Sequence, residues 1–167
     1  MSGASGGDGA RKTAVVTGAN SGIGKATASG LAKAGFDVTL VVRDLERGKA
    51  AIADIRKAAP GASLDLLRID LSSQQSVREG AATWLKSHDR LDVLVNAAGV
   101  FLKDRSETDD GIERTFATNY LAYFLLTHEL LPTLRAAAPS RVVNVTSRYG
   151  RTEIDFEDLM VKRREYT

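Results

Sequence analysis

Three closely spaced glycines follow a short apolar segment near the start of the chain. Gly18, Gly22 and Gly24 come after the β-branched run 13–16, and a helix-like pattern follows them. Glycine allows a tight turn and lets backbone N–H groups approach a ligand, while the first turn of a helix presents its positive end to an anion. We therefore predict a phosphate-binding turn between a strand and a helix.

Two other phosphate-binding motifs do not fit this turn. A Walker A loop needs a glycine at the position of Ala19 and a Ser or Thr at the position of Ala26. The pattern G-x-G-x-x-G also fails, because the glycines here run G-x-x-x-G-x-G. A purely structural turn remains open when the glycines are taken alone, since short motifs of this kind often occur without a ligand.

Strand-like and helix-like segments alternate along the rest of the chain. Apolar strands separated by helices are typical of a parallel sheet covered on both faces. We therefore predict an α/β fold of the Rossmann type, a doubly wound parallel sheet in three α/β/α layers that stops after about the fifth strand. Ligands of such sheets bind at strand–helix junctions, which favours the binding interpretation of the turn. The expected strands are 13–16, 38–42, 64–69, 91–95 and 141–145.

Apolar spacing predicts the buried faces of two helices. Ser72 and Gln75 have the spacing of a capping box that would begin the second of them. Gly35 suits the end of the first helix, and Pro132 interrupts a later one. The expected buried positions are Ile23, Ala26, Gly30, Leu31 and Ala34 in the first helix and Val77, Ala81, Trp84 and Leu85 in the second.

Composition excludes several classes of protein. The 23 Lys and Arg residues are interspersed with 21 Asp and Glu, so the net charge of +2 indicates no nucleic-acid partner. The chain has no cysteine, which excludes disulfides and thiol nucleophiles, and we expect no metal site. Residues 1–11 are expected to be a flexible tail before one domain at 12–147. The apolar stretch 120–126 is far shorter than the roughly 20 residues of a membrane span, so we expect a soluble, cytoplasmic protein.

The turn resembles the cofactor-binding turn of the short-chain dehydrogenase/reductase family, in which it holds the pyrophosphate of a nicotinamide dinucleotide. The segment Asn96–Gly99 is similar to the family's Asn-Asn-Ala-Gly but departs from it at Ala97, which loses an amide that could tie neighbouring strands. Asp70 follows the third strand, where the family places an aspartate near the adenine, although an Asp there also suits a turn. The cofactor-binding residues that the resemblance implies are Thr17, Gly18, Asn20, Ser21, Gly22, Ile23, Gly24, Arg43, Asp70, Leu71, Asn96, Ala97 and Gly99.

The end of the second strand bears on which nicotinamide cofactor is used. In the family, the acid of NAD users falls at the position of Val42, and Arg43 matches the arginine of NADP users. Spacing alone would instead select Asp44 as a ribose-binding acid and favour NAD. We expect NADP(H) to be preferred, with NAD(H) as the alternative, because an arginine pairs well with a 2′-phosphate.

The resemblance implies two catalytic residues. Asn119 matches the family's helix asparagine, and Ser147 matches the serine that hydrogen-bonds the substrate oxygen. An ordinary packed amide and an ordinary loop hydroxyl remain open for these two positions. The family's tyrosine with a lysine four residues later is not found. The residues four positions after Tyr120, Tyr123 and Tyr149 are Phe124, Thr127 and Glu153, and Tyr166 lies one residue from the end.

Residues 108–111, 138–141 and 154–159 resemble the retinol-dehydrogenase-like branch of the family, which has a longer loop between the serine and the tyrosine. By that register Tyr166 is a loop residue, 148–167 lead towards the catalytic helix, and the Tyr-x-x-x-Lys pair would begin beyond Thr167. We expect such an incomplete chain to expose an apolar strand edge and face, and therefore to self-associate or to depend on a partner.

The resemblance implies an oxidoreductase that interconverts an alcohol and a carbonyl by hydride transfer, inactive without the Tyr and Lys, and a homo-oligomer in its full length. The expected partners are the nicotinamide dinucleotide and a small-molecule substrate whose identity the sequence does not give. A non-catalytic nucleotide-binding module and an interaction protein remain as alternatives.

Overall fold

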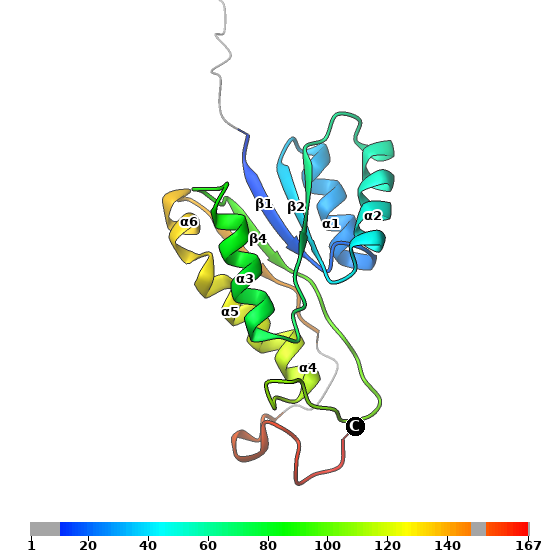
Figure 1. Cartoon of the computed structure of the whole chain (residues 1–167), viewed down its shortest axis with the longest axis vertical. Helices are drawn as coiled ribbons and strands as arrows, with labels where there is room; N and C mark the ends of the chain where they lie inside the picture. Colours follow the sequence, from blue (N-terminus) through cyan, green and yellow to red (C-terminus); the bar gives the residue numbers. More distant parts are fainter. Residues whose placement is uncertain (1–10, 148–152, 167) are drawn as a thin grey trace, which may run out of the picture.

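A sheet of five parallel strands forms the centre of the molecule (Figure 1). The computed structural model describes residues 11–147 and 153–166. The strand order is β3-β2-β1-β4-β5, and each adjacent pair is parallel. The predicted Rossmann-type sheet is therefore confirmed. The strands are β1 (Thr13–Thr17), β2 (Asp37–Val42), β3 (Leu64–Arg68), β4 (Val93–Asn96) and β5 (Arg141–Asn144).

Helices cover both faces of this sheet. One layer holds α1 (Gly22–Lys33) and α2 (Leu45–Ala58), and the other holds α3 (Gln74–Leu85), α5 (Ala122–Glu129) and α6 (Leu131–Ala136) (Figure 1). The short helix α4 (Arg114–Phe116) runs through a π-helical turn, η1 (Ala117–Leu121), into α5. A 3₁₀ turn, η2 (Phe156–Asp158), lies in the C-terminal segment, beyond the end of the sheet at which α4 lies (Figure 1).

Alternate residues of the central strands enter different cores. Val16 packs into the core beneath α1 and α2, whereas its neighbour Val15 packs into the core beneath α3 and α5. This alternation follows from the pleat of a strand, which turns successive side chains to opposite faces. In the second core, the Trp84 indole also donates a hydrogen bond of 3.0 Å to the hydroxyl of Thr39. Both faces of the sheet are thus apolar.

The predicted buried face of α1 is largely wrong, because only Leu31 of the five expected positions packs against the core. Gly24, Ala28 and Ala32 are buried, whereas Ile23 is 63% exposed. A Cβ added at Gly24 would lie only 2.5 Å from the carbonyl oxygen of Gly18, so the helix packs against the turn through this glycine. The alanines follow at intervals of one helical turn, and Ile23 is left on the outer side.

The predicted start of α3 is also wrong, although its buried stripe is confirmed. Ser73 is the N-cap, and its hydroxyl accepts a hydrogen bond of 3.2 Å from the amide of Ser76. The Ser72 hydroxyl instead donates to Asp70 at 2.7 Å. Gly35 follows the end of α1 with a φ of 85°, as predicted. Pro132 lies in the first turn of α6, just after the break between α5 and α6, which agrees with the predicted interruption. Val77, Ala81 and Trp84 are buried, with Leu85 packed against them.

β5 forms one edge of the sheet. All four of its residues are exposed, including Val142 at 42% and Val143 at 44%. The expected exposure of an apolar strand is confirmed in the described part of the chain, and the self-association stays a prediction. Among residues 11–147 and 153–166, no helix has the length and apolar character needed to cross a membrane.

Candidate functional site

A cavity of about 680 Å³ lies at the carboxyl ends of the central strands. Its walls come from the turn between β1 and α1, the ends of β2 and β3, the segment after β4, and the start of the α4–α5 helix. Sequence-distant segments therefore meet where ligands bind in open parallel sheets. The predicted residues that line it are Gly18, Asn20, Ser21, Gly22, Ile23, Gly24, Arg43, Asp70, Leu71, Ala97 and Gly99.

The N-terminus of α1 opens into this cavity without a cap. Ser21 is the N-cap residue, but its side chain makes no capping hydrogen bond, and the first turn contains no acidic residue. The first amides of a helix have no carbonyl partner within the helix, so this end keeps donors and a positive potential. Gly22 has a φ of 52°, and a Cβ added there would meet no atom within 4 Å. A helix N-terminus of this kind can donate hydrogen bonds from its amides to an anion, so the turn remains a candidate anion site.

Thr17 and Gly18 hold the floor of the cavity. The Thr17 side chain is fully buried, and its hydroxyl accepts hydrogen bonds from the amides of Ala97 at 2.9 Å and Ala98 at 3.0 Å. A Cβ added at Gly18 would lie 2.7 Å from the Cα of Ala98. The end of β1 and the segment after β4 are therefore in direct contact. Thr17 does not line the cavity but fixes two of its walls to each other.

Asn96 ties the last two strands together. Its side-chain amide donates to the Asn144 oxygen at 2.9 Å and to the Thr127 hydroxyl at 3.3 Å. β4 and β5 are therefore joined by a side-chain hydrogen bond although position 97 is an alanine. Asn96 is fully buried. Like Thr17, it does not line the cavity but holds neighbouring segments together.

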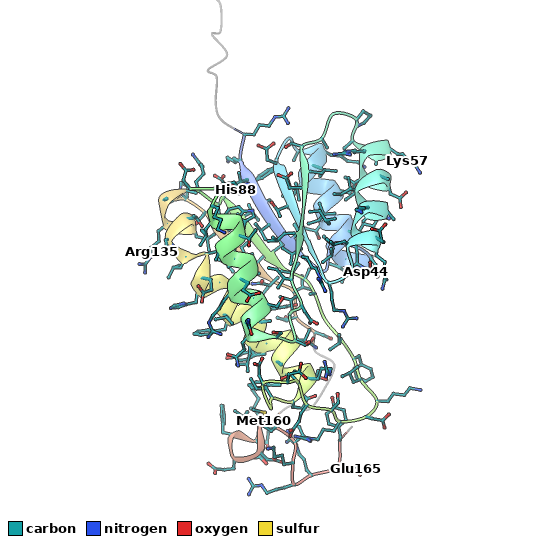
Figure 2. All side chains as sticks on the ribbon, viewed as in Figure 1. Asp44, Lys57, His88, Arg135, Met160 and Glu165 are labelled. Atoms are coloured by element: carbon teal, nitrogen blue, oxygen red, sulfur yellow. The ribbon has the colours of Figure 1, made fainter. Side chains whose placement is uncertain are left out.

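Two arginines at the beginning of α2 line the cavity beside a capped helix end. The Asp44 carboxylate accepts hydrogen bonds from the amides of Glu46 at 2.9 Å and Arg47 at 3.1 Å, and so caps α2. Arg43 and Arg47 line the same cavity as Asp44. Figure 2 shows Asp44 at the end of α2 next to the carboxyl ends of the strands, with Lys57 at the other end. The sequence prediction did not include Arg47, which lies in the first turn of α2.

Asp70 makes a turn after β3 and remains ionised. Burial acts to raise the pKa of Asp70, but hydrogen bonds from the Ser72 hydroxyl and amide lower it. The positive charges of Arg43 and Arg114 lower it further, so that the pKa lies below its ordinary value. Asp70 therefore stabilises the turn after β3 through its bonds with Ser72, and it also lines the cavity.

Asn119 lies in the π-helical turn and holds the segment after β4. Its side-chain oxygen accepts from the Val100 amide at 2.9 Å, and its side-chain NH₂ donates to the Val100 carbonyl at 2.8 Å. One turn later, the Tyr123 hydroxyl donates to the Ala98 carbonyl at 2.5 Å. Such π-helical turns are often found at functional sites. Sequence spacing alone did not identify Tyr123.

Ser147 lies just beyond β5 and is exposed. Neither Ser147 nor Asn119 is among the described residues that line the cavity. Tyr149 and the rest of 148–152 fall outside the described residues, as do positions 1–10 of the expected tail. The structure therefore brings most of the residues predicted to bind the cofactor into one cavity, whereas Asn119 contacts the cavity-lining residue Val100.

The C-terminal segment docks on the start of the α4–α5 helix. The Tyr166 hydroxyl lies 2.7 Å from the Thr115 hydroxyl and donates to the buried Glu113 carboxylate at 3.0 Å. Arg105 donates to the Met160 carbonyl at 2.8 Å. Met160 and Glu165 lie beyond the sheet on this side of the molecule (Figure 2). Tyr166 thus belongs to a loop contact, in keeping with its predicted place.

Comparison with known proteins identifies the class to which this fold and cavity belong. The family model of short chain dehydrogenases matches residues 12–157. The chain belongs to the short-chain dehydrogenase/reductase family.

Two curated relatives from the family illustrate how similar the sequences are. The chain is 46% identical to retinol dehydrogenase 13 of Mus musculus over 156 residues, which cover 93% of this chain and 47% of that protein. It is also 46% identical to dehydrogenase/reductase SDR family member 13 of Homo sapiens over 149 residues, covering 89% of this chain and 39% of that one. The chain thus spans about half the length of the curated relatives it matches.

Solved structures of short-chain oxidoreductases share the fold. A metagenomic short-chain oxidoreductase in complex with NADP is 33% identical, with a TM-score of 0.73, and the match covers 86% of this chain and 65% of that one. A short-chain dehydrogenase from Sphingobium yanoikuyae in complex with NADPH is 30% identical, with a TM-score of 0.70, covering 82% and 54%.

Proposed function

We propose that the chain is the cofactor-binding half of an NADP(H)-dependent oxidoreductase that interconverts an alcohol and a carbonyl compound. The observation that carries this proposal is the uncapped N-terminus of α1, which opens into a cavity between the ends of the strands. The family membership and the NADP complexes of similar structures support it. When bound, the nicotinamide supplies or accepts the hydride.

The residues present fit a dinucleotide. The free space above Gly22 and the uncapped amides of the first turn of α1 would accept the pyrophosphate oxygens. Asp70 and Leu71 line the part of the cavity beside the end of β3, which suits the adenine. Ala97 and Gly99 form the opposite wall, after β4. In this proposal the protein contributes binding and orientation, and the cofactor contributes the redox chemistry.

The preference for NADP(H) is inferred from the two charged residues that follow β2, Arg43 and Asp44. The Asp44 carboxylate is engaged by two amides of its own helix, so it is a poor candidate for binding the ribose hydroxyls. Arg43 lines the cavity at the same place, and a guanidinium forms strong paired hydrogen bonds with a phosphate. We assign Arg43 to the 2′-phosphate.

The substrate side of the proposal rests on two residues. Ser147 would donate a hydrogen bond to the substrate oxygen from the end of β5, as its position in the family motif implies. Asn119 would act through the segment after β4, because its side chain is bonded to both backbone groups of Val100. Ser147 is thus assigned to substrate contact and Asn119 to positioning.

Titration of the chain with NADPH and with NADH, followed by nicotinamide fluorescence, tests the cofactor assignment. NADPH should bind at least about tenfold more tightly than NADH, since charge-assisted hydrogen bonds contribute roughly 1.5–3 kcal/mol. Arg43→Ala should remove most of this difference by weakening NADPH alone. Arg56→Ala, at the exposed far end of α2, is the matched control. Absence of saturable binding of either cofactor would refute the proposed function, and equal affinities would refute the NADP preference.

A further inference from the structure

We propose that Tyr123 is a positioning residue for the nicotinamide half of the cofactor site, acting through the backbone of Ala98. This inference rests on the proposed function and deepens it. Tyr123 lies in the first turn of α5 and does not itself line the cavity. Its hydroxyl donates to the Ala98 carbonyl, and Ala98 lines the cavity wall. Tyr123 therefore reaches the site through one backbone group.

The strand order places Ala98 on the nicotinamide side. β2, which ends one residue before the proposed 2′-phosphate residue Arg43, and β4, which leads into Ala98, lie on opposite sides of β1. The glycine turn that follows β1 lies between them. A dinucleotide with its 2′-phosphate at Arg43 and its pyrophosphate at this turn must extend its other half over the segment after β4.

Ala98 is held from two sides. Its amide donates to the Thr17 hydroxyl at 3.0 Å, and its carbonyl accepts from Tyr123. These two bonds fix the orientation of the peptide groups on either side of the Ala98 Cα. The Asn119 side chain holds Val100 in the same segment but does not contact Ala98 through these bonds. Loss of the Tyr123 hydroxyl would leave the Ala98 carbonyl without this donor. The segment after β4 would then be more mobile at Ala98.

Tyr123 is suited to a constant hydrogen-bonding role. Burial raises the pKa of Tyr123 above its ordinary value, so the phenol remains protonated and a donor at neutral pH. Its ring is half-buried, whereas Tyr120 on the same helix is 63% exposed and stacks on Phe116. Tyr120→Phe therefore provides a matched control, because it removes the same atom outside the cavity wall.

The test compares Tyr123→Phe with Tyr120→Phe in two titrations, one with NADPH and one with adenosine 2′,5′-bisphosphate, which lacks the nicotinamide half. Tyr123→Phe should weaken NADPH about fivefold, the effect of one hydrogen bond, and leave the affinity for the bisphosphate unchanged. Tyr120→Phe should change neither. In the free protein, hydrogen exchange at the amides of Ala98 and Val100 should become faster in Tyr123→Phe only.

The possible outcomes separate this inference from the proposed function. If the unaltered chain binds neither ligand, the proposed function fails and the inference fails with it. If the unaltered chain binds NADPH and Tyr123→Phe binds it equally well, only the inference is overturned. Equal weakening of NADPH and the bisphosphate would also overturn it, since that result indicates a general loss of structure. Unchanged hydrogen exchange at the two amides would show that Tyr123 does not hold the segment.

Discussion

The helices α1 and α2 begin at the same end of the sheet, but only α2 has a side-chain cap at its N-terminus. α2 begins with Asp44, whose carboxylate accepts from two amides, and has Glu46 in its first turn. α1 begins with Ser21, which makes no capping hydrogen bond, and has no acidic residue in its first turn. The amides and positive potential of α2 are satisfied by its own side chains, whereas those of α1 remain available.

This difference indicates how a helix end becomes a binding site. An unsatisfied N-terminus costs stability, and a cap residue would recover about 1 kcal/mol. α1 lacks this stabilising cap at its N-terminus, which lines the cavity. In our proposal the pyrophosphate takes the place of the cap. Three substitutions test this contrast between the helices.

The largest effect is expected from Gly22→Val. The side chain would enter the open space above the turn, where the proposal places the pyrophosphate, and NADPH affinity should fall by roughly 100-fold or more as several charge-assisted hydrogen bonds are lost. Gly35→Val is the matched control, because Gly35 also has a positive φ and open space around it but lies at the other end of α1. Equal NADPH affinity in the two variants, measured by titration, would contradict the assignment of the turn.

Ser21→Asp should make the N-terminus of α1 resemble that of α2. The new carboxylate can cap the helix, so the free energy of unfolding should rise by about 0.5–1 kcal/mol in denaturant titrations. NADPH affinity should fall about tenfold, because the carboxylate repels the pyrophosphate and competes for the amides. Ser21→Asn separates the two causes, since it can cap without adding charge. A gain in stability with no loss of affinity would show that the cofactor does not use this helix end.

The smallest effect on binding is expected from Asp44→Ala. Removal of the cap should lower the free energy of unfolding by about 1 kcal/mol, and Asp44→Ser should restore most of it. NADPH affinity should change by less than about threefold, because the carboxylate is not needed for binding in our proposal. A selective loss of NADH affinity would instead support the alternative in which Asp44 binds the ribose.

The sequence was sufficient to predict the sheet and most of the cavity. All five strands are found within about two residues of their expected bounds, because alternating apolar strands and helices leave few other arrangements. The glycine turn, Arg43 and Asp70 line one cavity, as the resemblance implied. Their assignment to the cofactor stays a prediction until binding is measured.

The errors arose where tertiary contacts override local patterns. The buried face of α1 was misplaced because the close approach of Gly24 to Gly18, not apolar spacing, decides how this helix packs. The start of α3 was misplaced by one residue because Ser72 is used by Asp70. The sequence does not single out Arg47 and Tyr123, because their roles depend on contacts between segments that are distant in the chain. Residue spacing does not predict such contacts.

The hydrogen bonds of Thr17 have a consequence for the order of folding. Thr17 and Ala98 are 81 residues apart in the chain, so the floor of the cavity cannot form until β4 has joined β1. An early unit of β1, α1 and β2 would contain the glycine turn but would lack this floor. A ligand that needs both would therefore bind only after β4 has paired with β1, and its binding free energy would stabilise the folded state.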